Sequence, residues 1–379
     1  MKNINFKKNK SQIYIHHIGG KGGSIDFPVL PKFKKEISYI IYDADEDCID
    51  DIKELWKDYN AIIKPFCLFS RDATIKMNIN HDTFANSIYD LNPEFGNYYH
   101  QGHDGVTDHV YSGAINTYNT IDIQSNKLDT LVQKNKVPEP DFISLSCAGA
   151  ELPVLEGSIN CLKKSVVGVY CRVHFSEKWK NSPLFSELDH FMKKNNFILT
   201  SISSNLSGYN RVPKIARGVG HALTGNALYI LNPEKIIANE NLELIRKLEK
   251  ISLVALNFGH TELAYDAINK CVKSGLNYEK DYLYQKFLYD FHSEIKKNKD
   301  LPELWHEKWS INEVKKLSKF SNLKKRSKFQ ALIIKFTKKI ISFFRIKFHI
   351  VRKNNSFEKF LLKNGFKNLV KTLKNRDKF

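Results

Sequence analysis

A glycine-rich loop follows a short apolar run near the N-terminus, and an acidic residue follows the next apolar run. Residues 12–18 lead into Gly19, Gly20 and Gly23, and Asp43 closes the second run. Glycines let a nucleotide-like ligand approach the backbone, and a carboxylate at this point can accept hydrogen bonds from ribose hydroxyls. The alternative is a turn that only needs positive φ. The loop lacks Gly-x-x-x-x-Gly-Lys-Ser/Thr, which argues against a P-loop for ATP or GTP.

Two groups of histidines could also do chemistry. His174 follows a strand-like run, where imidazole could act as a general base because it titrates near neutrality; a structural histidine is the alternative. A second array comprises His100, His103, Asp104, Asp108 and His109. It could place imidazoles and a carboxylate on one cation, but it has no His-Glu-x-x-His and no cysteine partner. We therefore predict no metal site and interpret the array as a polar or substrate-facing loop.

The pattern of apolar runs indicates which elements position these residues. Strand-like runs alternate with helical spacing, as in an α/β domain with a mainly parallel sheet. The predicted strands cover residues 12–18, 37–42, 61–69, 141–147, 166–173, 197–202 and 226–231. Leu152, Leu155, Ile159 and Leu162 predict one helix after the fourth strand. Ligands of such sheets bind beyond the carboxyl ends of the strands, so we expect the glycine loop, Asp43 and the turn after residue 145 to lie together.

Several motifs, taken in order, resemble a known family. They are Tyr42-Asp-Ala-Asp, Ala85-Asn-Ser-Ile-Tyr-Asp-Leu, Lys127-Leu-Asp-Thr-Leu, Pro140-Asp-Phe-Ile-Ser-Leu-Ser-Cys-Ala-Gly-Ala-Glu-Leu-Pro-Val-Leu-Glu-Gly, Arg172-Val-His-Phe and Trp179-Lys-Asn-Ser-Pro-Leu-Phe. Together with the glycine loop, they resemble the core of the FkbM-type S-adenosylmethionine-dependent methyltransferases, over roughly residues 12–233. The resemblance implies an α/β class I methyltransferase (Rossmann-like) sandwich. Its seven-stranded, mainly parallel sheet would have an antiparallel strand near residues 226–231, and a C-terminal helical extension would follow the domain.

The resemblance also implies a cofactor, an acceptor and site residues. The cofactor would be S-adenosyl-L-methionine, and the acceptor a sugar hydroxyl of a glycan or glycolipid precursor. The catalytic candidates are His174 and Ser146. The cofactor-binding candidates are His17, Gly19, Gly20, Gly23, Asp43, Ala44, Ser87, Ser146 and Glu151.

Four positions depart from the family pattern. His17, Ser146 and Ala148 stand where the family has carboxylates, and Arg172 stands where it has glutamate. Such carboxylates would bind the methionine ammonium or accept protons near the substrate hydroxyl. The alternative interpretation is therefore a methyltransferase fold without turnover, which serves as a binding or scaffold protein.

The charge of the chain is concentrated at its C-terminus. The net charge is +18, and residues 315–379 hold 21 basic and 2 acidic residues. Within them, residues 329–351 mix lysines with large apolar residues, as in a helix that binds an anionic membrane surface. No recognised nucleic-acid motif accompanies this tail, so nucleic acid is the weaker candidate partner. A solvated lysine-rich extension is the third alternative.

The same features predict the domain organisation and location. We expect a flexible basic segment (1–11), the α/β domain (12–236), a helical region with an αα-hairpin (237–314) and the basic amphipathic tail (315–379). No apolar run suits a membrane span or a secretion signal, and the six cysteines form no CxxC pair. We therefore predict a cytoplasmic protein that the tail can bring to the cytoplasmic membrane face. The oligomeric state is not predicted.

Overall fold

The computed structural model describes residues 12–22, 27, 31–103, 107–209, 221–236, 241–297 and 362–363. Of the predicted segments, 1–11 lies outside these residues, as do Gly23 and all of 315–379 except 362–363. Contacts group residues 1–288 into one compact unit and 289–379 into a second. The helices α8 and α9 described below thus belong to the same unit as the sheet, and the predicted domain boundaries remain predictions.

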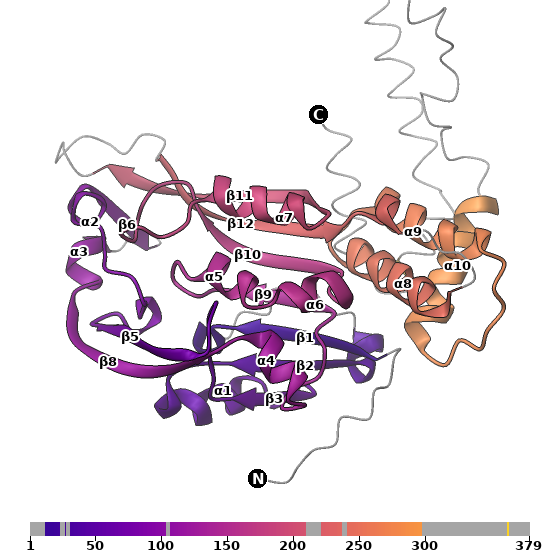
Figure 1. The fold of residues 1–379 in the computed structure, drawn as a ribbon. Helices are drawn as coiled ribbons and strands as arrows, with labels where there is room; N and C mark the ends of the chain where they lie inside the picture. Colours follow the sequence, from indigo (N-terminus) through magenta and orange to yellow (C-terminus); the bar gives the residue numbers. More distant parts are fainter. Residues whose placement is uncertain are drawn as a thin grey trace, which may run out of the picture. The chain divides into compact units, whose positions relative to one another are not determined.

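The main sheet has the seven predicted strands, and a hairpin extends it (Figure 1). The third strand is shorter than the predicted 61–69, because only residues 61–64 join this sheet. In spatial order the seven are β3 (Ala61–Lys64), β2 (Ile37–Tyr42), β1 (Ile13–Ile18), β9 (Phe142–Leu145), β10 (Gly168–His174), β12 (His221–Leu231) and β11 (Phe197–Tyr209). The strands β3, β2, β1, β9 and β10 pair in parallel. β12 runs antiparallel to β10 and β11. The class I methyltransferase-like sandwich, with its antiparallel strand near residues 226–231, is thereby confirmed.

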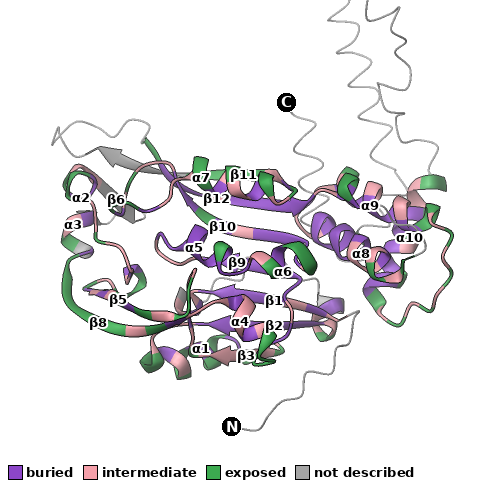
Figure 2. Ribbon diagram, in the orientation of Figure 1, coloured by how far each residue is buried: buried purple, intermediate pink, exposed green. Residues whose placement is uncertain are grey.

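The segment between β3 and β9 holds structure that hydrophobic periodicity did not predict. A hairpin of β6 (Tyr99–His103) and β7 (Thr107–Val110) continues the main sheet beyond β11. A separate sheet contains β4 (Cys67–Leu68), β8 (Thr117–Asn126) and β5 (Ala73–Asn80). Figure 2 shows β8 largely exposed while the central strands are buried. Polar, half-exposed strands give little apolar signal, which explains why this region read as a loop.

The short helices are α1 (Ile49–Leu55), α2 (Pro93–Tyr98), α3 (Tyr111–Ala114), α4 (Leu128–Gln133), α5 (Glu151–Glu156), α6 (Ile159–Lys164) and α7 (Phe185–Lys194). The structure corrects the prediction of one helix after β9, because α5 and α6 are separate. At the break, a Cβ on Gly157 would lie 2.1 Å from the Phe69 carbonyl oxygen. The Asp129 carboxylate then accepts the first free N–H groups of α6, from Asn160 and Cys161, at 2.9 and 3.0 Å. The close approach and the cap together end one helix and start the next.

The predicted αα-hairpin is present as α8 (Leu242–Asn257) and α9 (Thr261–Lys273), and α10 (Leu283–Lys297) follows. Gly259 (φ 88°) forms the turn and Gly275 (φ 70°) ends α9, both in the left-handed region that favours glycine. The Lys250 ammonium of α8 pairs with the Asp141 carboxylate, just before β9, at 2.6 Å. α8 is therefore anchored to the start of the strand whose other end carries the candidate site. No helix of the described residues could span a membrane.

Candidate functional site

Three loops meet at the carboxyl edge of β1, β2 and β9. The Gly19 N–H donates to the Tyr42 carbonyl oxygen at the end of β2, and the Ser146 N–H donates to the Ile18 carbonyl oxygen at the end of β1, both at 3.0 Å. The predicted meeting of the glycine loop, the Asp43 loop and the turn after β9 is thus observed. Within this edge, the structure brings together Gly19, Gly20, Asp43 and Ser146.

Gly19 and Gly20 are required by the protein's own packing. Gly19 has φ 91°, and a Cβ there would lie 2.2 Å from the Ser146 carbonyl oxygen. A Cβ on Gly20 would lie 2.5 Å from the Ile41 side chain. Only glycine lets the loop run this close to β2 and to the turn after β9. The glycine loop is consequently held against the carboxyl ends of the strands, where ligands of such sheets bind.

Asp43 faces the glycine loop and binds its backbone. One carboxylate oxygen accepts the Lys21 N–H at 2.9 Å, and the other accepts the Asp45 N–H at 3.1 Å. The Lys21 ammonium in turn pairs with the Asp45 carboxylate at 2.9 Å. A carboxylate has about four acceptor positions, so Asp43 keeps acceptor capacity for a diol after these two bonds. The neighbouring Ala44 is half-buried.

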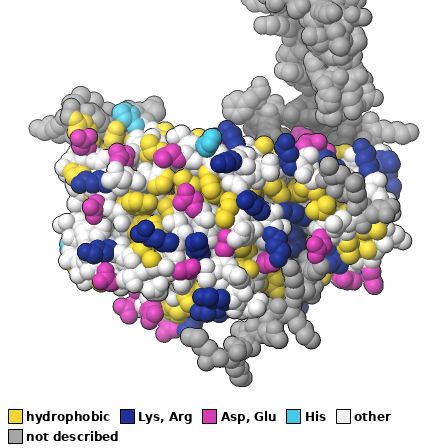
Figure 3. Space-filling view, in the orientation of Figure 1, with side chains coloured by type: hydrophobic (Ala, Val, Ile, Leu, Met, Phe, Trp, Pro, Cys, Tyr) yellow, Lys and Arg dark blue, Asp and Glu magenta, His cyan; other side chains and the backbone are white. Residues whose placement is uncertain are grey.

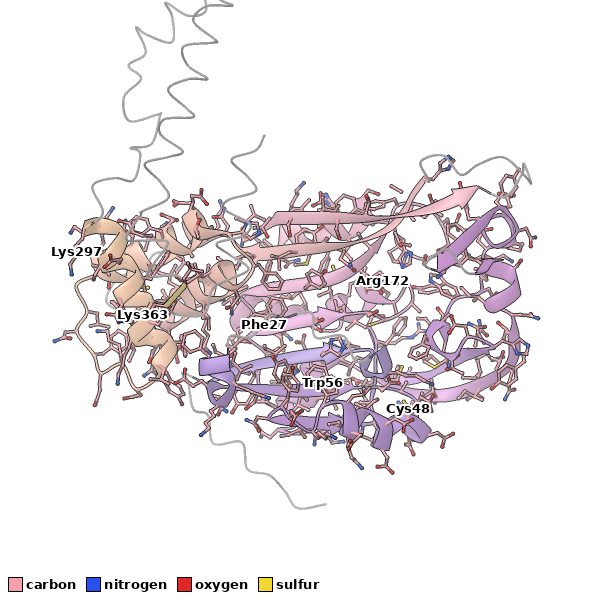
Figure 4. The ribbon with its side chains drawn as sticks, turned by 180° about the vertical axis from the view of Figure 1, so that it is seen from behind. Phe27, Cys48, Trp56, Arg172, Lys297 and Lys363 are labelled. Carbon is pink, nitrogen blue, oxygen red and sulfur yellow. The ribbon has the colours of Figure 1, made fainter. Side chains whose placement is uncertain are left out.

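His17 lies in the core, beneath the glycine loop. Its Nδ1 is 3.0 Å from the Ser144 hydroxyl, and its ring packs 5.8 Å from that of Trp56. Burial lowers the pKa of His17 to about 4, with an opposing hydrogen bond to the Gly19 backbone. Figure 4 labels Trp56 and Cys48 beside β1 and β2, and Arg172 on another part of the sheet. The imidazole is thus neutral at physiological pH and cannot replace a carboxylate charge.

Glu151 shapes the turn between β9 and α5. Its two carboxylate oxygens accept the N–H groups of Cys147 and Gly149, at 2.9 and 3.0 Å. Burial is the main effect on its pKa and raises it, while these N–H groups and Arg172 oppose the rise. The turn places Ala148 (φ 48°) and Gly149 (φ 100°) in the left-handed region. Glu151 therefore stabilises the loop that carries Ser146, which is itself half-buried.

Ser87 lies in the segment between β5 and α2 and binds the turn after β9. Its hydroxyl donates to the Ala148 carbonyl oxygen at 2.7 Å and accepts the Tyr89 N–H at 3.1 Å. The side chain is 2% exposed. Ser87 thus stabilises the turn that carries Ser146, a residue predicted to bind the cofactor.

His174 lies at the end of β10, one strand away from these loops. It is 3% exposed, and neither ring nitrogen has a hydrogen-bond partner among the described residues. Burial, helped by the Lys178 and Arg172 charges, lowers its pKa to about 3. A pocket lined by Glu151, Arg172 and His174 adjoins it, with about 10 Å³ of space open to the centre of a water molecule.

Two cations next to His174 were missed as candidate site residues. Arg172 stands in the sequence analysis only as a departure from the family pattern. Lys178 was not a candidate, although it directly precedes the motif that begins at Trp179. The Lys178 ammonium lies 4.7 Å from the Tyr111 ring centre and 5.1 Å from that of Trp179. Figure 3 shows basic and acidic side chains interspersed over the visible face. Because charges of both signs are mixed in this way, the distribution of charged residues does not mark Arg172 and Lys178 as site residues.

The histidine array considered for a metal falls on the β6–β7 hairpin. His100 pairs with Val110 and His103 with Thr107 in its backbone register, but the side chains from residue 100 to 110 and all of 104–106 lie outside the described residues. Among the residues that are described, no three His, Cys, Asp or Glu side chains gather as a metal site.

Comparison with protein families identifies a methyltransferase domain in this chain. Residues 46–199 match the family model described as "Methyltransferase FkbM domain", which confirms the resemblance. No curated protein matches the chain. Among solved structures, it is similar to a precorrin-6y C5,15-methyltransferase from Geobacter metallireducens, with 7% identity and a TM-score of 0.30 over 58% of this chain and 80% of the other. Similarity at that level carries no argument about the activity.

Proposed function

From the methyltransferase FkbM domain over residues 46–199, we propose that this protein transfers a methyl group from S-adenosylmethionine to an oxygen, a sugar hydroxyl of a glycan or glycolipid precursor. The observation that carries the proposal is the position of Asp43. Its carboxylate stands at the end of β2, faces the glycine loop and keeps free acceptor capacity after binding two backbone N–H groups. A ribose diol is the ligand that this arrangement suits.

The residues at the edge of the sheet fit the cofactor in part. When bound, S-adenosylmethionine supplies a methyl group on a sulfonium, open to in-line attack by an oxygen. Asp43 would bind the ribose hydroxyls, while Gly19 keeps the backbone of the loop close to Ser146. Glu151 would act on the cofactor only by fixing the turn, because it is 2% exposed and its carboxylate binds N–H groups of its own loop. We propose no direct cofactor contact for His17, which packs against Trp56.

The acceptor would approach from the side of β10. His174 is neutral at physiological pH, so it offers one nitrogen that can accept a hydrogen bond from a hydroxyl. A pKa of about 3 makes it a weak base, and its contribution would be to orient the acceptor oxygen. Positioning of this kind supplies much of the acceleration of a methyl transfer, even without a strong base.

Calorimetric titration of the full chain tests the cofactor site. S-adenosylmethionine and S-adenosylhomocysteine should both bind, and Asp43→Asn should weaken them by about 1.5–3 kcal/mol. The matched control is Asp47→Asn, since Asp47 is an exposed aspartate four residues further along the chain. Absence of binding at millimolar concentration, or equal affinity in the Asp43 variant, would refute the assignment. A methyl-transfer assay on extracted glycans then tests turnover.

The departures at His17, Ser146, Ala148 and Arg172 favour a second candidate, a methyltransferase fold that binds without turnover. In that case the basic segment 315–379 would bring the protein to an anionic membrane as a scaffold. Cofactor binding without methyl transfer to any extracted glycan would favour this candidate. Methyl transfer would exclude it.

A further inference from the structure

Three nitrogen-bearing side chains converge at the carboxyl end of β10. Arg172 and His174 are two residues apart on the strand, so they share one face of the sheet. Lys178 comes from the loop that follows, with its ammonium against the Tyr111 and Trp179 rings. We call Arg172, His174 and Lys178 the β10 cluster. It lies beside the turn from Ser146 to Glu151, on the acceptor side of the proposed site.

Carboxylates near this cluster attract its cations from a distance but do not pair with them. Among the described residues, no ion pair or hydrogen bond joins an acidic side chain to Arg172 or to the Lys178 ammonium. The nearest acids are Glu151 and Asp82, whose oxygens accept backbone N–H groups of their own loops rather than a hydrogen bond from the cluster. Burial first, and then repulsion by Arg172, lowers the pKa of Lys178 to about 8, against the opposing attraction of Asp82 and Glu151. Most Lys178 side chains nevertheless remain protonated at pH 7.

His174 provides a second and independent observation. It is 3% exposed, lines the pocket beside Glu151 and Arg172, and has no hydrogen-bond partner on either nitrogen within the described structure. A buried polar group without a partner costs free energy that a ligand can recover. A neutral imidazole has one N–H donor and one acceptor nitrogen. It can therefore donate to an anion and still accept a hydrogen bond from a hydroxyl.

We propose that the β10 cluster binds an oxyanion of the acceptor, so that the substrate is an acidic sugar with a carboxylate or phosphate group. This inference rests on the proposed methyl transfer to a sugar hydroxyl. Arg172 is exposed, and its planar guanidinium can bind two oxygens of either group side by side. The pocket has room for about one water molecule. One anion oxygen would enter it next to His174, and the sugar ring would remain outside.

The test uses the full chain, saturated with S-adenosylhomocysteine, and three sugars: glucose, glucuronate and glucose 6-phosphate. We expect at least one anionic sugar to bind at least tenfold more tightly than glucose. Tighter binding of glucuronate identifies a carboxylate, and tighter binding of glucose 6-phosphate identifies a phosphate. Equal binding of all three sugars, or binding of none at millimolar concentration, would overturn the proposal.

Variants at the exposed end of the cluster make the test specific. Arg172→Gln should weaken the anionic sugar at least tenfold, and Arg172→Lys should restore part of that loss. The matched control is Lys180→Gln, an exposed lysine on the same loop, which should bind like the parent. If Arg172→Gln binds the anionic sugar like the parent, the assignment is wrong. S-adenosylhomocysteine affinity, measured on each variant, should stay unchanged, so that failure of the cofactor site is recognised separately.

Discussion

Replacing Lys250 with methionine should destabilise the α/β unit, although Lys250 lies on α8 and outside the matched domain. Its ammonium binds the Asp141 carboxylate at 2.6 Å, and the two side chains are only 11% and 7% exposed. Asp141 also accepts the Tyr14 N–H of β1 at 2.9 Å. The pair therefore ties α8 to two central strands. Its loss would leave a buried carboxylate without its counter-ion.

The expected cost follows from that burial. Removing one partner of a buried ion pair costs about 3–5 kcal/mol. For a unit of this size, the melting temperature should fall by roughly 6–20 °C. Asp141→Asn combined with Lys250→Met removes both charges and keeps an acceptor for Tyr14, so it should recover most of the loss. The matched control is Lys53→Met, which breaks an exposed pair with Asp50 and should change little.

The pH dependence of the variant gives a further check. Burial already raises the pKa of Asp141, and removing the Lys250 charge would raise it more. A carboxyl with a folded pKa above its unfolded value costs stability only when ionised, so the deficit should grow as the pH rises through the folded pKa. Urea denaturation should thus show a larger loss at pH 8 than at pH 5. A loss below about 1 kcal/mol at both pH values would show that α8 is not docked through this pair.

Three other predictions concern the site, the core and the tail. Asp43→Ala should lower the free energy of unfolding by about 1–3 kcal/mol, because Asp43 accepts two backbone N–H groups, and it should also weaken cofactor binding. Urea denaturation and calorimetry measure the two effects, and Asp47→Ala should show neither. Burial lowers the pKa of His16 to about 3. Between about pH 6.5 and pH 3, His16 therefore takes up a proton only in the unfolded state. The free energy of unfolding should fall by up to about 1.4 kcal/mol per pH unit as the pH is lowered through this range. His16→Gln should reduce this slope in denaturation at several pH values, whereas a change at exposed His190 should leave it as it was. The full chain should sediment with anionic vesicles and be partly released by salt. A chain ending at Asn312 should remain folded and stay in solution. Tighter binding to RNA than to vesicles would contradict the membrane proposal.

The α/β fold was predictable from the sequence because its central strands are buried on both faces. Runs such as Ile37–Tyr42, buried at every position, give a strong apolar signal and end at loop residues with distinct chemistry. The glycines that end α9 and form the α8–α9 turn were likewise visible, since the left-handed backbone favours glycine. The meeting of the glycine loop, Asp43 and Ser146 followed from the rule that parallel strands share one carboxyl edge.

Only the tertiary structure decided what each candidate side chain does. The sequence places His17 at the end of a strand, but its orientation into the core against Trp56 depends on which face α1 covers. Glu151 turns back on its own loop because Cys147 and Gly149 present N–H groups to it, a geometry that only the folded turn creates. Arg172, His174 and Lys178 form a cluster because the loop after β10 sets Lys178 against Tyr111, near His174. Contacts between residues far apart in the chain determine burial and charge compensation, and local residue patterns do not contain that information.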